Sequence, residues 1–269
     1  MRNLLHANLR RLVRSRAFLL AVLAELAYTA LVVLVCWDHY AAGTANYTME
    51  SILTAGFGLM GYLPVPSLIA APLLSLHLGA DYSDNTLRNK LIAGHTREEV
   101  YLADVLTCVM ATVGLDVLYL VLSGLLCIYP ILGMSGILLR VSPGQMLAWT
   151  GTALLARAAW AAVIKMAVTL LGNRTTASIA GLLLVLAAAG ACAFGFHELE
   201  YLARHPEAAN PEARMAFWRL ALDVLPTGQY LQVSRLDTPF LWRMPLLSLS
   251  AIAASTAARL FLFRRKDLK

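Results

Sequence analysis

Charged residues are scarce in this 269-residue chain. Asp, Glu, Lys and Arg make up only 14% of it, whereas a soluble domain carries about 25%. Hydrophobic residues account for 59%, and the mean hydropathy is +0.66. This composition argues against a water-soluble globule and indicates an all-α membrane protein in which residues 1–269 form a single domain.

Several signatures of chemistry are also missing. No C-x-x-C pair occurs, and the four cysteines lie in or at the end of apolar runs, so they are interpreted as packing residues. Neither H-E-x-x-H nor G-x-S-x-G is present. No lysine follows a glycine, which excludes a phosphate-binding P-loop. We therefore expect no catalytic residue, no metal site and no cofactor bound by this chain.

Long apolar stretches are abundant instead. A transmembrane helix needs roughly 20 mostly apolar residues. Six stretches meet this requirement: Ala17–Trp37, Ile52–Leu78, Leu102–Ile128, Met146–Leu171, Ile179–Phe196 and Met244–Phe263.

The distribution of Lys and Arg predicts the orientation of these spans. Segments 1–16, 79–101, 172–178 and 264–269 together carry thirteen basic residues. The segments between the other ends of the spans carry six in much more chain. We therefore predict that both termini and 79–101 are cytoplasmic, and that 197–243 is extracytoplasmic.

The N-terminal segment 1–16 has the pattern of an amphipathic helix lying in the lipid interface. Its apolar face carries Leu5, Leu9, Leu12 and Val13, and arginines surround this face. The simpler alternative is a basic segment that only enforces the topology.

The 79–101 loop contains signals for two helices. Ser83 or Asp84 can cap a short helix, and Gly94 can end it in the left-handed conformation. Thr96 and Glu99 then form a capping box at the start of the next helix. The loop thus predicts a cytoplasmic helix over Asn85–Ala93 that is directly connected to the third span.

The outer segment 197–243 is too short for an independent domain with its own core. We expect it to rest on the outer lipid surface through Phe217, Trp218, Ala221 and Leu222, and to turn at Pro226–Gly228.

Four ionisable residues fall inside the predicted spans: Glu25, Asp116, Arg157 and Lys165. A charge at the helix centre costs about 2.5–3.5 kcal/mol on insertion scales. Lys165 is near a span end, so its side chain can extend to the interface. For Glu25, Asp116 and Arg157 two interpretations stay open. They form a polar site on a substrate or ion path, or an acid–arginine pair that neutralises itself and fixes helix order.

The second predicted span contains residues that interrupt a helix, among them Gly61, Pro64 and Pro66. Broken helices at membrane depth occur along transport pathways, but a single kinked helix packed on its neighbours fits the same residues.

At three places the chain resembles the type-2 ABC transporter permeases, the six-span membrane subunits of many bacterial exporters. The first is the core Thr86–Leu87–Arg88–Asn89–Lys90–Leu91, followed by a glycine turn into the third span. The second is Leu225–Pro226–Thr227–Gly228–Gln229, and the third is the ending Phe263–Leu268. A large polar outer domain, present in many members, is missing. This favours the compact kind that exports drugs or peptides.

The resemblance implies a permease of the bacterial inner membrane that pairs with a second copy or a sister permease. It also implies a separate ATP-binding subunit, which holds ATP and Mg and docks on the loop after the second span. The docking residues would be Thr86, Leu87, Arg88, Lys90, Leu91, Ile92 and Gly94. An antimicrobial peptide, a drug or a lipid-like molecule would be exported.

Two alternatives from other classes remain. One is a membrane enzyme acting on lipid-linked substrates through Glu25, Asp116 and Arg157, which would form product without a partner. The other is a non-transporting immunity or scaffold protein, which would protect cells even when ATP hydrolysis by any partner is abolished. Neither nucleic-acid binding nor an enzyme activity of this chain is expected.

Overall fold

A computed structural model describes residues 2–41, 86–133, 143–171, 174–234 and 238–265. Within these ranges all regular secondary structure is helical. The helices are α1 (Arg2–Val13), α2 (Arg16–Ala41), α5 (Thr86–Ile92), α6 (Arg97–Gly133), α7 (Pro143–Leu171), α8 (Arg174–Arg204), α9 (Pro211–Val224), α10 (Pro226–Ser234) and α11 (Arg243–Arg265).

Four of the described helices are long and apolar enough to cross a membrane. Their apolar segments are Arg16–Leu34, Arg97–Ser123, Leu147–Val168 and Thr175–Arg204. They confirm long apolar helices at the first, third, fourth and fifth predicted spans. The second, Ile52–Leu78, lies outside the described residues. At the sixth, Met244–Phe263, α11 forms a helix of 23 residues that is not among these four, so six spans stay a prediction.

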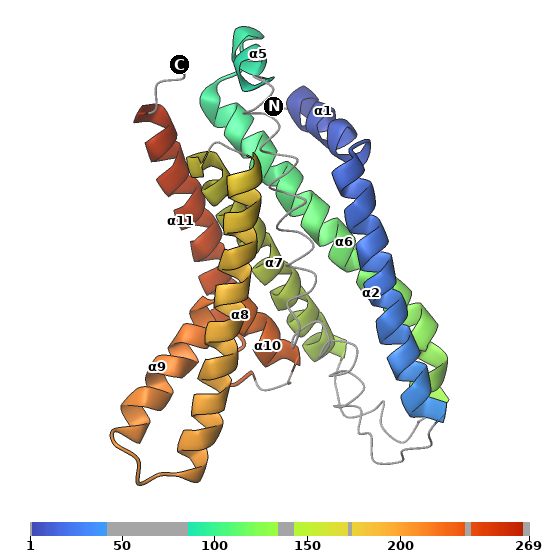
Figure 1. The fold of residues 1–269 in the computed structure, drawn as a ribbon, viewed down its shortest axis with the longest axis vertical. Helices are drawn as coiled ribbons and strands as arrows, with labels where there is room; N and C mark the ends of the chain where they lie inside the picture. Colours follow the sequence, from blue (N-terminus) through green and yellow to red (C-terminus); the bar gives the residue numbers. More distant parts are fainter. Residues whose placement is uncertain (1, 42–85, 134–142, 172–173, 235–237, 266–269) are drawn as a thin grey trace.

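Helix α7 lies at the centre of the bundle, in contact with α6, α8, α10 and α11 (Figure 1). Its alanines explain how several helices approach it closely, since small side chains let helix backbones come near each other. The buried ones are Ala153, Ala156, Ala158, Ala159, Ala161 and Ala162.

The start of α1, helix α5 and the end of α11 gather at one end of the molecule (Figure 1). The connection between α8 and α9 lies at the opposite end. This arrangement agrees with the predicted placement of both termini and 79–101 on one side, while the orientation relative to a cell stays a prediction.

Helix α1 packs on protein through a face that only partly coincides with the predicted apolar face, since the two share Leu12. Leu4, Asn8 and Leu12 are buried, and α1 contacts α6 and α2. Val13, by contrast, is 59% exposed. The predicted apolar face does not include Asn8, because a polar amide is not expected in a core. Asn8 is buried because its amide has a hydrogen-bond partner on α6.

The outer segment folds back into the bundle. Pro226–Gly228 is the first turn of α10 rather than a separate turn, and Leu222, expected to face lipid, is only 2% exposed. Leu222 packs with Cys192, Phe196 and Leu231. Phe217 is 61% exposed, as a residue facing the outer lipid surface would be.

Gly228 is required where α10 meets the end of α9. A Cβ atom at this position would lie 2.7 Å from Cα of Leu222 and even closer to the Leu222 carbonyl oxygen. Both neighbours are backbone atoms, which cannot rotate away. Only glycine therefore allows α10 to pack at this position.

Candidate functional site

An ion pair is buried in the middle of the bundle. Arg157 on α7 places its Nε atom 3.0 Å from Oδ2 of Asp116 on α6, and both residues are 2% exposed. Isolated charges at this depth are costly, and pairing removes much of the cost. The prediction that Arg157 pairs with Glu25 or Asp116 is confirmed, with Asp116 as the partner.

Helix α10 supplies a third member of this cluster. Arg157 donates a hydrogen bond from Nη2 to the Tyr230 hydroxyl at 3.1 Å, and its Cζ atom lies 4.6 Å from the centre of the Tyr230 ring. One turn further along α7, Trp160 donates from Nε1 to Thr227 Oγ1 at 2.9 Å. Two side-chain hydrogen bonds therefore join α10 to α7.

No local pattern in the sequence marks Tyr230 as a member of the buried cluster, and Thr227 stands out only within the Leu225–Gln229 motif of the family resemblance. Both lie in a segment that reads as an outer loop, where a tyrosine and a threonine next to Pro226 and Gly228 are ordinary. Their place in the buried cluster depends on the return of α10 into the bundle.

Glu25 on α2 joins the cluster without forming an ion pair among the described residues. It is 1% exposed, and its Oε1 atom has no hydrogen-bond partner within the described part of the chain. Arg157 attracts its carboxyl group electrostatically, and Asp116 repels it. The Tyr28 hydroxyl, one helical turn along, is also buried without a hydrogen-bond partner among the described residues. The Tyr28 ring stacks on Tyr119 of α6, with 5.7 Å between ring centres.

A second polar cluster is centred on Asp104 of α6, near the end of the molecule where α5 lies. Its Oδ2 atom is 2.7 Å from Nζ of Lys165 on α7. Its Oδ1 atom accepts from Nδ2 of Asn8 at 2.9 Å and lies 3.4 Å from Nζ of Lys90. A single carboxylate thus holds side chains from α1, α5 and α7.

This cluster corrects the expectation for Lys165. The residue does not extend to a lipid interface, because it is only 1% exposed and its ammonium group contacts Asp104 and lies 5.8 Å from the Tyr101 ring centre. In the sequence Asp104 lies only a few residues after the charged loop 79–101, so it does not stand out as a charge inside a span. The position of a residue along one helix does not reveal which residue of another helix it contacts.

The described part of the predicted docking loop, residues 86–101, forms the expected local structure, while the predicted caps Ser83 and Asp84 lie outside the described residues. Helix α5 spans Thr86–Ile92, within the predicted Asn85–Ala93. Gly94 has φ +90°, in the left-handed region where glycine is favoured. Thr96 and Glu99 form the capping box: the Thr96 amide donates to Glu99 Oε2 at 3.1 Å, and the Glu99 amide donates to Thr96 Oγ1 at 3.2 Å.

The side chains proposed for docking divide into two groups. Lys90 points to Asp104, and Leu91 packs against Leu4, Val100 and Ala103, so both face the protein. Ile92 is 74% exposed and lies on the surface. Thr86, Leu87 and Arg88 belong to the first half of α5.

The residues of the predicted broken helix, Gly61, Pro64 and Pro66, lie outside the described residues. Within the described ranges, no group of three or more His, Cys, Asp or Glu side chains is arranged to hold a metal ion.

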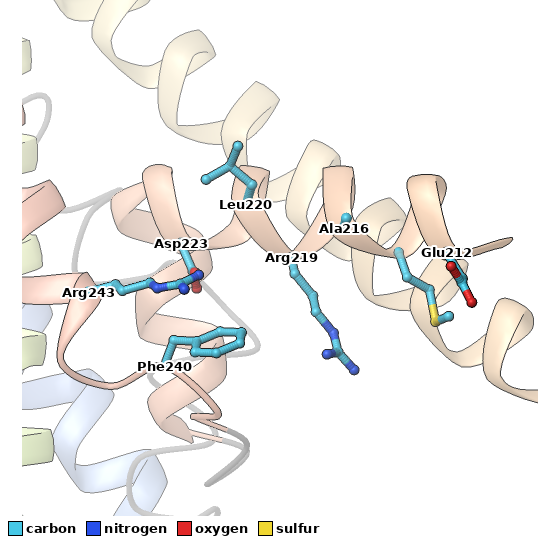
Figure 2. A pocket seen from close by; sticks show the side chains of 8 residues that line it. Glu212, Ala216, Arg219, Leu220, Asp223, Phe240 and Arg243 are labelled. Atoms are coloured by element: carbon cyan, nitrogen blue, oxygen red, sulfur yellow. The ribbon is translucent and has the colours of Figure 1, made fainter. Parts of the chain in front are cut away.

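An open groove of about 360 Å³ runs along α9 toward the start of α11 (Figure 2). Arg219 and Arg243 line it together with the acids Glu212 and Asp223, so its charges balance. Arg243 lies over Phe240, with Cζ 4.0 Å from the ring centre. Burial raises the pKa of Asp223, and a hydrogen bond from Gln232 opposes this rise. The groove is an amphipathic surface with no excess charge of either sign.

Comparison with known proteins adds no family assignment: no protein-family model matches the chain, and no curated protein matches it significantly. The helical fold indicates the class. Four described helices are long and apolar enough to span a bilayer, which indicates a multi-pass α-helical membrane protein.

Proposed function

We propose that this protein is the membrane-spanning permease subunit of an ATP-driven exporter of the type-2 ABC class, acting on an amphipathic substrate in a bacterial inner membrane. It carries no ATPase site of its own in this proposal. A separate subunit binds and hydrolyses ATP, and a second copy or a sister permease completes the transporter.

The observation that carries the proposal is the connection between α5 and α6. A short helix at one end of the bundle continues through Gly94 and a capped turn into a membrane-length helix. Lys90 and Leu91 contact Asp104, Val100 and Ala103 on that helix. A force applied to α5 therefore reaches α6 through side-chain contacts as well as through the backbone.

An exposed residue of α5 fits a docking role. Ile92 is an exposed apolar side chain on a short helix that also carries Arg88 and Lys90, and apolar residues surrounded by charge are typical of protein interfaces. Lys90 and Leu91, in contrast, support the helix from inside. A substitution at Ile92 therefore tests docking, whereas a substitution at Lys90 or Leu91 would disturb the packing of α5 on α6.

The test uses Ile92→Asp in the full chain, with Val13→Asp as the matched control. Val13 is an apolar residue on α1 and is 59% exposed. Helix α1 lies at the same end of the molecule as α5 (Figure 1). We expect the affinity-tagged wild type, purified in mild detergent, to bring ATPase activity with it, and Ile92→Asp to lose most of it at an unchanged permease level. Val13→Asp should retain the activity.

Equal ATPase activity in the Ile92→Asp and wild-type preparations would contradict docking through α5. ATPase activity absent from the wild-type preparation as well would contradict the exporter proposal itself.

A further inference from the structure

The buried cluster holds more acid than base. Asp116 and Glu25 are carboxylic acids, and Arg157 is the basic residue that acts on both. The guanidinium group is already in contact with Asp116 at 3.0 Å and with the Tyr230 hydroxyl at 3.1 Å. If both carboxyl groups were ionised, the described cluster would carry one excess negative charge away from water.

Among the described residues, Arg157 is the group that stabilises such a charge on Glu25, and it is already paired with Asp116. The groups that act on it from the packed helices are Asp116 on α6 and Arg157 on α7. On its own helix, the Tyr28 hydroxyl has no hydrogen-bond partner among the described residues, and the Thr29 hydroxyl donates to the Glu25 backbone oxygen rather than to its carboxyl group. Tyr230, on α10, donates nothing to Glu25 in the described structure and is bound to Arg157.

We propose that Glu25 is a proton-binding site that is occupied in this conformation. The carboxylate takes up a proton from the aqueous phase, an O–H bond forms at the carboxyl group, and the side chain becomes neutral within the bilayer. The described cluster then holds one positive and one negative charge. A neutral carboxyl group costs far less to bury than a carboxylate.

A proton fits this place better than a metal cation does. Calcium takes 6–8 oxygen ligands, and magnesium takes six in an octahedron. Around this place the described chain provides the carboxyl groups of Glu25 and Asp116 and the Tyr28 hydroxyl, which are too few ligands for either metal, and the nearby guanidinium repels cations. Binding and release of the proton also require water to reach Glu25, so the occupancy of this site responds to opening of α2 against α6 and α7.

The inference does not depend on the export function, because it is tested on the purified chain alone. Infrared spectra of the full-length protein in lipid nanodiscs are recorded in D₂O at neutral pH. We expect the carbonyl stretching band of a protonated carboxylic acid in the wild type and its loss in Glu25→Gln. The exposed control Glu212→Gln should retain it.

Replacing the competing acid gives an independent check. In Asp116→Asn the excess negative charge is absent, so Glu25 becomes the counter-ion of Arg157, and the band should disappear as well. A band that persists in Glu25→Gln but disappears in Asp116→Asn would overturn the proposal, because the proton would then belong to Asp116. Absence of any such band from the wild type at neutral pH would also overturn it.

Thermal unfolding as a function of pH gives the second readout. An unfolded glutamate ionises at about pH 4.3 and carries no proton at neutral pH, so a native state that keeps the proton of Glu25 loses stability as the pH rises. The wild type should therefore lose thermal stability from mildly acidic to alkaline pH more steeply than Glu25→Gln. Equal slopes, or stabilisation of the wild type but not Glu25→Gln by sodium ions at fixed ionic strength, would refute a proton site.

Discussion

Breaking the buried ion pair should destabilise the protein more than removing the pair altogether. The perturbation is Asp116→Leu in a Glu25→Gln background, where no other acid of the described cluster can take its place beside Arg157. It replaces the carboxylate by an apolar side chain of similar volume and takes a contact of 3.0 Å away from Arg157. Removing one member of a buried pair costs about 3–5 kcal/mol. With about 2–4 °C of melting temperature per kcal/mol for a chain of this size, the expected loss is about 6–20 °C. Replacing both residues by leucine leaves no uncompensated charge and should cost less than Asp116→Leu alone.

The assay is thermal unfolding of the purified variants in one detergent at one pH. The conservative Val117→Leu is the matched control, since Val117 lies next to Asp116 but is 42% exposed and should change the stability by no more than about 0.5 kcal/mol. The coupling between the two sites is read from the double-mutant cycle. If the single losses simply added in the double variant, the two charges would not interact and the reasoning would be wrong.

Two further predictions follow from close contacts. Gly228→Ala should lower stability by about 1–3 kcal/mol, because its Cβ would overlap the Leu222 backbone. Gly190→Ala, where a Cβ meets nothing within 4 Å, is the control in the same unfolding assay, and similar behaviour of the two variants would refute the close packing of α10. Asp104→Asn should be more damaging than Lys165→Met, because it removes the carboxylate shared by three side chains, whereas Lys165→Met leaves Asp104 near Lys90. The reverse order of melting temperatures would contradict Asp104 as the centre of that cluster.

Local signals in the sequence predicted the helices and the turn after α5. Runs of about 20 apolar residues predict membrane-length helices because each backbone polar group must be satisfied within its own helix in the bilayer. The positive φ of Gly94 and the reciprocal hydrogen bonds of Thr96 and Glu99 depend on neighbours within a few residues. The local sequence pattern was therefore sufficient to predict this turn.

The sequence also indicated that the charges inside the spans must find partners. It restricted Arg157 to Glu25 or Asp116 because these three residues lie at similar depth. It did not choose between the two acids, since the rotation of each helix about its axis is set by packing against the others. The structure turns Asp116 to Arg157 and leaves Oε1 of Glu25 without a hydrogen bond among the described residues.

Contacts between distant segments were decided only by the tertiary structure. Asp104 meets Asn8 across 96 residues and Lys165 across 61, and Arg157 meets Tyr230 across 73. No local pattern encodes such pairs, because they depend on how the helices cross. The same holds for α10, whose sequence is that of an outer loop. Gly228 lets it approach the end of α9, and the hydrogen bonds of Thr227 and Tyr230 to α7 keep it in the bundle.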